Sequence, residues 1–131
     1  MINRPSQQRK LICSASLDET VRVWDVETGD EILTLAHNSA LIGCSFSHSG
    51  LFVGTLAVDN VTRIFDVSGG SSSLVDDTSG RPPVMAGAVV GAAFRKLDNG
   101  QEVLVIAEVR PPTSLVLGRE MYLPAPESKN V

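Results

Sequence analysis

The chain has 131 residues, a formal net charge of −4 and a pI near 5.0. It carries no basic stripe of the kind that follows a nucleic-acid backbone, so strong direct binding to DNA or RNA is not expected. No apolar run reaches the roughly 18 residues that a membrane-spanning helix needs. The first ten residues lack the apolar core of a secretory signal. We therefore expect a cytoplasmic protein that contacts no membrane.

The first predicted group of strands begins after a polar N-terminal tail, residues 1–10. Residues 11–15 and 21–25 alternate apolar and polar side chains, which is the period of strands with one buried face. Asp18 and Glu19 lie between them and can form a tight turn, because Asp bonds its own backbone. Residues 32–35 are predicted as a short outer strand.

The next segment predicts a second unit of the same kind. Strands are expected at residues 40–46, 51–56 and 61–66. The stretch 68–83 is rich in Ser, Gly and Pro, so it is predicted as a long surface loop. An outer strand is then expected at 84–86. The loops 36–39 and 68–83 are candidate binding surfaces because of their predicted exposure.

The remaining strands predict a third, degenerate unit that has no Trp-Asp pair and no turn Asp. Asn99-Gly100 is a strong hairpin-turn sequence between two apolar runs. The strands are expected at residues 89–94, 102–107, 115–117 and 121–123. Residues 124–131 are predicted as a C-terminal tail.

The chain has two cysteines, Cys13 and Cys44, and both fall in predicted strands. A free cysteine packs as a small apolar side chain, and a disulfide framework would need more cysteines in so short a chain. We therefore predict two buried free thiols and a reducing compartment.

The first two units repeat with a fixed offset. Asp18 matches Asp59, Trp24 matches Phe65 and Asp25 matches Asp66, an offset of 41 residues in each case. WD-type propeller blades repeat every 40–45 residues and end a strand in Trp-Asp. The stretch from Asp18 to Asp25 thus resembles a WD repeat, and the stretch ending in Phe65-Asp66 is similar but weaker.

This resemblance implies an all-β fold, a WD-repeat β-propeller of about two blades plus a degenerate third. The blades would span residues 11–35, 36–87 and 88–123. A closed ring usually needs four to eight blades. We therefore expect either a fragment of a longer protein, which we favour, or a chain whose ring is completed by another molecule.

The resemblance also implies a set of structural hydrogen-bond positions. In WD repeats a His before the inner strand, a Ser or Thr on the second strand, the turn Asp and the Trp often form a hydrogen-bonded chain. These positions correspond here to Ser14, Asp18 and Trp24 in the first repeat, and to His37, Thr55 and Asp59 in the second. Phe65 replaces the second Trp and cannot donate an N–H.

No catalytic, cofactor-binding or metal site is predicted. A Ser/His/Asp set could suggest a hydrolase, but the chain has no G-x-S-x-G elbow. His37 and His48 are separated by a whole predicted strand, and no Cys/His cluster has zinc spacing. Arg22 and Arg63 recur with the repeat and either pair with a nearby acid or remain solvated.

Within the WD-repeat family, the order of well-formed and poorly formed repeats resembles subunit i of eukaryotic translation initiation factor 3. The serine/threonine-kinase-receptor-associated protein has a similar blade order. The first resemblance implies a noncatalytic scaffold that binds the b and g subunits of that factor and acts with the 40S ribosomal subunit. The alternatives are another WD-repeat adaptor, in signalling, RNA–protein assembly or ubiquitin transfer, and an enzyme or a β domain that is not a propeller.

Overall fold

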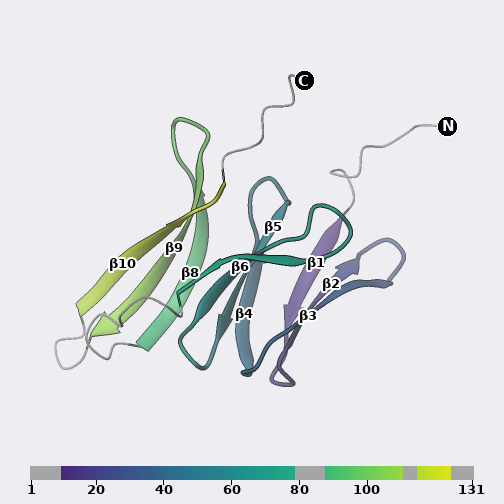
Figure 1. Ribbon diagram of the computed structural model, residues 1–131, viewed down its shortest axis with the longest axis horizontal. Coiled ribbons are helices and arrows are strands. Elements are labelled where there is room, and N and C mark those ends of the chain that lie inside the picture. The colour runs from purple at the N-terminus through teal and green to yellow at the C-terminus, as the bar shows by residue number, and fades with distance from the viewer. Residues whose placement is uncertain (1–9, 79–87, 111–114, 125–131) are drawn as a thin grey trace. The chain divides into compact units, whose positions relative to one another are not determined.

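A computed structural model describes residues 10–78, 88–110 and 115–124, and every regular element in these ranges is a β-strand (Figure 1). The chain divides into two compact units, Met1–Pro82 and Pro83–Val131. The described residues contain no helix that is long and apolar enough to cross a membrane.

Sheet A is the first sheet of the first unit. It contains β1 (Leu11–Ala15), β2 (Thr20–Asp25) and β3 (Glu31–Ala36), antiparallel and in that order. Val21 and Val23 are buried, whereas the side chains that alternate with them on β2 are only half-buried. This period of two is the one that the sequence predicted for a strand with one face on a core.

Sheet B follows directly in the chain and has four strands, β4 (Leu41–Phe46), β5 (Phe52–Ala57), β6 (Thr62–Asp66) and β7 (Ser73–Asp77), paired in that order. β5 lies between β4 and β6, and its residues from Val53 to Ala57 are all buried. Both faces of this strand are therefore covered.

The prediction of a continuous loop over residues 68–83 is wrong, because β7 occupies part of this range. β7 pairs with β6 through the backbone, and Ser73, Leu74 and Val75 on it are exposed. An outer strand of this kind needs no apolar face, so its Ser-rich composition resembles that of a loop. The predicted outer strand at 84–86 lies outside the described residues.

The turns of the first sheet recur 41 residues later in the second sheet, as the sequence repeat does. The β1–β2 turn and the β5–β6 turn each place one residue in the left-handed region, Glu19 with φ 77° and Asn60 with φ 65°. The β2–β3 and β6–β7 turns do the same with Gly29 and Gly70, whose φ values are 79° and 81°. The two sheets are therefore built on one repeated pattern of turns.

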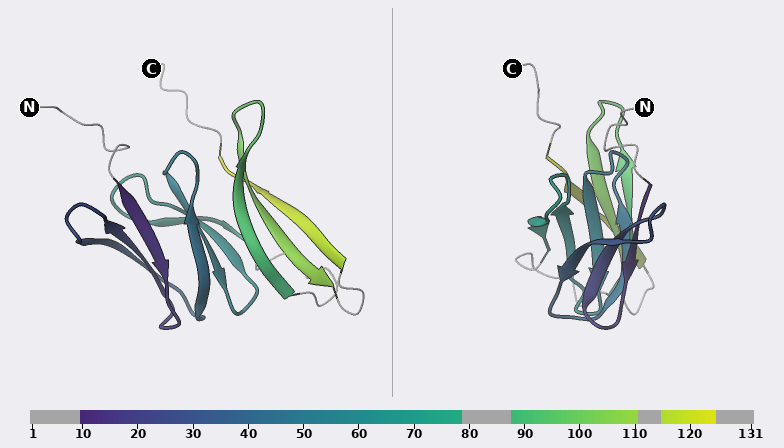
Figure 2. Two further views of the ribbon diagram at one scale, coloured as in Figure 1. Left: turned by 180° about the vertical axis from the view of Figure 1, so that it is seen from behind. Right: turned by 90° about the vertical axis from the view of Figure 1, so that its right-hand side faces the viewer.

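Sheets A and B pack against each other within the first unit (Figure 2). Their buried side chains form one cluster, to which each sheet contributes. The members of this cluster are Val21, Val23 and Leu35 from sheet A, and Leu41, Val53 and Ala57 from sheet B. The strongest contact between the two sheets is that of β1 with β4.

The second unit is a three-stranded antiparallel sheet of β8 (Ala88–Lys96), β9 (Glu102–Arg110) and β10 (Leu115–Tyr122), with β9 in the centre. The predicted Asn99-Gly100 turn joins β8 to β9, and Gly100 has φ 87°. Two strands were expected at 115–117 and 121–123. This is wrong, because the backbone pairing with β9 continues through Gly118 and Glu120 as one strand.

The prediction of an all-β fold is confirmed for the described residues. The three sheets are open and antiparallel, as expected for part of a WD-repeat β-propeller. In the first unit, sheet B follows sheet A in the chain and packs against it. Successive blades of a propeller are arranged in this way.

Candidate interaction site

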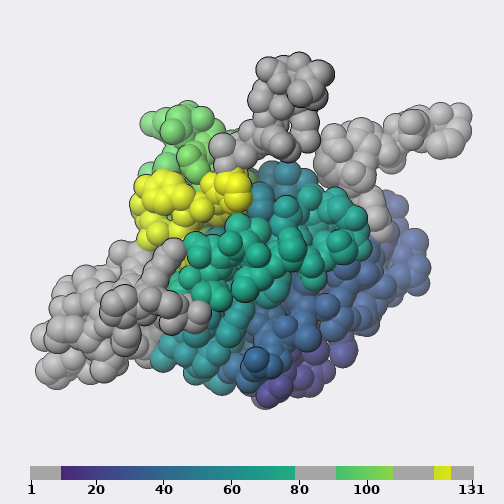
Figure 3. Space-filling model, in the orientation of Figure 1, coloured from purple at the N-terminus to yellow at the C-terminus, as the bar shows by residue number. Residues whose placement is uncertain are grey.

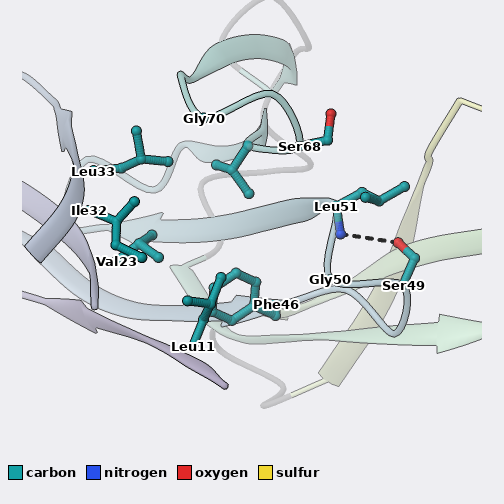
Figure 4. A pocket seen from close by; sticks show the side chains of 11 residues that line it. Leu11, Val23, Ile32, Leu33, Phe46, Ser49, Gly50, Leu51, Ser68 and Gly70 are labelled. Atoms are coloured by element: carbon teal, nitrogen blue, oxygen red, sulfur yellow. Dashed lines mark hydrogen bonds between the residues drawn. The ribbon is translucent and has the colours of Figure 1, made fainter. Parts of the chain in front are cut away.

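A pocket of about 340 Å³ opens between sheets A and B, at the end of the sheets where β1 begins and β4 ends (Figure 4). Its lining is mainly apolar and comes from both sheets and two turns. The lining residues are Leu11, Val23, Ile32, Leu33, Phe46, Ser49, Gly50, Leu51, Val67, Ser68 and Gly70. A volume of this size lies at the lower end of the range of ligand pockets.

Two glycine turns form one side of the pocket. Gly50, in the β4–β5 turn, has φ 78°, and Gly70, in the β6–β7 turn, has φ 81°. No atom would obstruct a Cβ at either glycine, so the positive φ is the reason for glycine at both positions. Because neither turn carries a side chain there, the space between the two sheets stays open.

Leu51 is the most exposed large apolar side chain of the lining, with 41% of its surface accessible. Its backbone N–H donates to the Ser49 hydroxyl over 3.2 Å, which fixes the turn that carries it (Figure 4). Leu51 thus adds an exposed apolar side chain to the edge of an apolar pocket, and apolar surface around a pocket of this kind is suited to contact with another protein.

Acidic residues outnumber basic ones at this end of the sheets, where Lys10 precedes β1. Asp25 ends β2, Glu31 begins β3 and pairs with Arg22 at 3.9 Å, and Asp66 ends β6. The carboxylates of Asp25 and Asp66 also fix the turns that follow them. Asp25 Oδ1 accepts from the Glu27 N–H at 2.8 Å, and Asp66 Oδ1 accepts from the Ser68 N–H at 2.9 Å. The Asp of the Trp24-Asp25 and Phe65-Asp66 pairs therefore stabilises the turn that follows its strand.

The predicted hydrogen-bond positions lie elsewhere, away from the pocket. Trp24 Nε1–H donates to the Ser14 hydroxyl over 3.0 Å, across the β1–β2 pair. In sheet B the equivalent of Ser14 is Thr55, which is 1% exposed, and the equivalent of Trp24 is Phe65. The aromatic ring of Phe65 meets the ring of His37 edge to face, with centroids 5.3 Å apart.

His37 links sheet A to sheet B through both ring nitrogens. Nδ1 lies 3.0 Å from the Leu35 carbonyl oxygen, which can only accept, so Nδ1 carries the proton and donates. In the neutral ring, Nε2 then accepts from the Thr55 hydroxyl at 3.0 Å. Partial burial lowers the pKa of His37, and the positive charge of Arg63 lowers it further.

Asp18 and Asp59 each bond within their own turn. Asp18 Oδ1 accepts from the Thr20 N–H at 3.0 Å, and Asp59 Oδ1 accepts from the Val61 N–H at 2.9 Å. Both carboxylates also pair with the arginine four residues on, at 3.5 Å for Arg22 and 3.1 Å for Arg63. The sequence left open whether Arg22 and Arg63 pair with a nearby acid or remain solvated, and the structure shows that both pair.

Thr55 is buried, and its hydroxyl is used by His37. Among the residues that the structure describes, no three His, Cys, Asp or Glu side chains lie close enough to hold a metal ion.

The two thiols meet at the contact of sheet A with sheet B. Cys13 and Cys44 are both free, as predicted, but each is half-buried rather than fully buried. Hydrogen bonding with the Cys44 thiol raises the pKa of Cys13, as burial also does, and the same interaction lowers the pKa of Cys44.

Comparison with known proteins supports the WD-repeat resemblance over part of the chain. No protein-family model matches it. It is 37% identical over 57 residues to a coronin-like protein of Saccharomyces cerevisiae, which is 44% of this chain and 9% of that protein. It is 36% identical over 55 residues to the serine-threonine kinase receptor-associated protein of Gallus gallus, 42% of this chain and 16% of that protein.

A third relative is the B subunit of chromatin assembly factor 1 of Mus musculus, 39% identical over 57 residues, which is 43% of this chain and 10% of that protein. All three are WD-repeat proteins. The chain thus spans less than a fifth of the length of these relatives.

The pocket was not predicted from the sequence. Leu11 and Val23 belong to strands whose alternation predicts one buried face, and this pattern does not distinguish the lining of a pocket from a core. Of the two loops proposed as binding surfaces, 68–83 contributes Ser68 and Gly70 to the pocket, whereas 36–39 joins β3 to β4 at the opposite end of the sheets. The recurrence of glycine in the turns at one end of both repeats was the available signal.

Proposed function

We propose that this chain is a noncatalytic protein-interaction module, and that the pocket between sheets A and B receives an apolar side chain of a protein partner. The observation that supports this is the exposed Leu51 at the edge of an apolar pocket formed by two rigid sheets. Binding energy at protein interfaces is concentrated in a few side chains that fill such pockets.

The charge around the pocket favours a partner segment with basic residues beside its apolar anchor. The strand ends and turns nearby carry Asp25, Glu31 and Asp66. Complementary charge at an interface increases the association rate and selects partners more than it increases affinity. Two of the relatives are, by their names, associated with a receptor or part of an assembly factor, which supports a role in holding proteins together.

The finer proposal is that the chain acts in eukaryotic translation initiation factor 3, in the cytoplasm, with the b and g subunits of that factor and the 40S ribosomal subunit as partners. It rests on the order of well-formed and poorly formed repeats in the sequence. The similarity to the kinase receptor-associated protein favours a second candidate, an adaptor in signalling.

The test is affinity purification of the tagged full chain from cells, with quantification of initiation-factor subunits, 40S proteins and kinase receptors. The informative variant is Leu51→Glu, which places a charge at the edge of the pocket. The matched control is Leu17→Glu in the β1–β2 turn, where the leucine is 75% exposed and outside the pocket lining.

We expect Leu51→Glu to reduce recovery of the specific partner about tenfold, which corresponds to about 1.4 kcal/mol of binding energy. Leu17→Glu should leave recovery unchanged. Equal recovery by both variants would reject the pocket as the binding site. Absence of initiation-factor subunits and 40S proteins from the wild-type sample would reject the finer proposal.

A further inference from the structure

Cys13 and Cys44 are the chain's two cysteines, and the fold brings them together from different sheets. Cys13 is the middle residue of β1 in sheet A, and Cys44 lies on β4 in sheet B. β1 and β4 are the strands through which the two sheets make their strongest contact. Both cysteines pack against the same buried cluster. We propose that these two thiols form a modification site, which a small-molecule disulfide oxidises to a reversible disulfide between the sheets.

The geometry satisfies the first requirement, which is that the two thiols lie opposite each other although 30 residues separate them in the chain. The Leu41 N–H donates to the Ser16 carbonyl oxygen at 3.0 Å where β1 ends and β4 begins, and Leu11 and Phe46 line one pocket where β1 begins and β4 ends. Cys13 and Cys44 lie between these two points, on strands that face each other in the packed core. Facing strands are what a disulfide needs, provided that the Cα atoms lie within about 7 Å.

Access is the second requirement, and partial exposure supplies it. Residues two apart on a strand share a face. Leu11 therefore lies on the same face as Cys13, and Phe46 on the same face as Cys44, and both Leu11 and Phe46 line the pocket. Neither cysteine lines the pocket itself, but both are half-buried rather than fully buried, which leaves part of each residue open to a small reagent.

The chemistry assigns a role to each sulfur. We assign the attack to Cys44, because the neighbouring Cys13 lowers the pKa of Cys44 whereas the pKa of Cys13 is raised, and the thiol that ionises more readily is the nucleophile. The Cys44 thiolate attacks one sulfur of a disulfide such as oxidised glutathione, forms a mixed disulfide and expels one glutathione thiolate, which takes up the proton that Cys44 released. Cys13 then loses its proton, attacks the Cys44 sulfur and expels the second glutathione thiol. The two cysteines are oxidised, and one disulfide is reduced to two thiols.

The test is incubation of the full chain with oxidised glutathione, in buffer and in urea, followed by peptide mass mapping without reduction. We expect the folded protein to give mainly a Cys13–Cys44 disulfide within one molecule. The ratio of this product to mixed glutathione adducts should be at least about tenfold higher than in urea, because the fold raises the effective concentration of the second thiol. The oxidised protein should have a higher Tm than the reduced protein, since the new bond constrains the unfolded chain.

Single variants check the assigned order. Cys13→Ser should stop the reaction at a stable glutathione adduct on Cys44, and Cys44→Ser should form an adduct on Cys13 about tenfold more slowly. The proposal is overturned if the folded wild type gives mainly mixed adducts or intermolecular dimers, or the same product ratio as in urea. It is also overturned if the internal disulfide lowers the Tm, because the thiols would then be joined only by distorting the sheets.

Discussion

At the residue scale, Glu19 and Asn60 show how the two repeats solve one turn with different residues. Both have a left-handed backbone, with φ 77° and 65°. Asn tolerates this conformation because its short polar side chain bonds locally, whereas a longer side chain is strained in it. The first repeat therefore contains a less suitable residue at the equivalent position.

Glu19→Asn is expected to stabilise the protein, raising the free energy of unfolding by about 0.5–1 kcal/mol through relief of this strain. The measurement is urea unfolding followed by Trp24 fluorescence. Glu27→Asn is the matched control, since Glu27 is an exposed turn glutamate without a positive φ, and it should change the free energy by less than about 0.5 kcal/mol. No gain from Glu19→Asn would show that the turn relaxes around the glutamate.

His37 gives the pH dependence of the first unit. Its pKa is lowered in the folded state by burial and then by Arg63, so the folded protein binds the proton less readily than the unfolded chain does. The neutral ring thus contributes stability that is fully present above the unfolded pKa of about 6.5 and is lost as the pH falls through the folded pKa.

We therefore expect the free energy of unfolding of the wild type to fall between about pH 7 and pH 5, and to fall less in His37→Gln. Urea titrations across this range measure the difference. His48→Gln, which removes the exposed histidine, should keep the wild-type loss. Parallel curves for the wild type and His37→Gln would contradict the assignment.

The sequence predicted individual side-chain contacts only between residues at recurring positions of the WD repeat. The hydrogen bonds of Ser14 with Trp24 and of His37 with Thr55 join residues that the WD resemblance had placed in one chain. The repeat could not give the tautomer of His37, because the partner of Nδ1 is a backbone carbonyl whose position depends on the path of the chain. Nor could it give the Cys13–Cys44 contact, which depends on how two sheets pack.

At the scale of elements, the Ser-rich composition of residues 68–83 led to the prediction of a loop, whereas the structure has β7 within this range. Residues 31–36 form β3, and the same positions one repeat later are 72–77, where β7 lies. The 41-residue period corresponds to a strand at these positions, whereas the Ser-rich composition is typical of a loop. The two differ because backbone hydrogen bonds can form an outer strand, paired on one edge, without an apolar face. The teal segment that includes β7 lies on the surface in Figure 3.

This position predicts that β7 opens locally while β5 does not. β5 is buried and paired on both edges, whereas β7 pairs with β6, and three of its five residues are exposed. Amide exchange in β7 is expected to be at least about tenfold faster than in β5 after correction for sequence. Hydrogen exchange with mass spectrometry measures this. Equal protection of the two strands would mean that sheet B opens only as a whole.

At the scale of the whole molecule, the two sheets of the first unit share a buried cluster to which both contribute. Sheet A has three strands and sheet B has four. Either sheet alone would leave exposed the apolar face that it buries against the other. Val23 and Leu35 from one sheet pack in the same cluster as Leu41 and Val53 from the other. A repeat of this kind buries its face only against its neighbour, which is why the pocket at the end of the contact could not be found in either repeat by itself.

The shared core predicts that a change in one sheet destabilises both. Leu35, at the end of β3, is 1% exposed, and Leu35→Ala is expected to cost about 2–5 kcal/mol, from lost burial and the cavity left behind. Hydrogen exchange should then show faster opening of β2 in sheet A and of β5 in sheet B by the same factor. Leu17→Ala is the matched control, because this leucine is 75% exposed, and its cost should stay below about 0.5 kcal/mol. If Leu35→Ala accelerated exchange in β2 and left β5 unchanged, the two sheets would be separate folding units, and the pocket between them would be a gap rather than a part of one rigid surface.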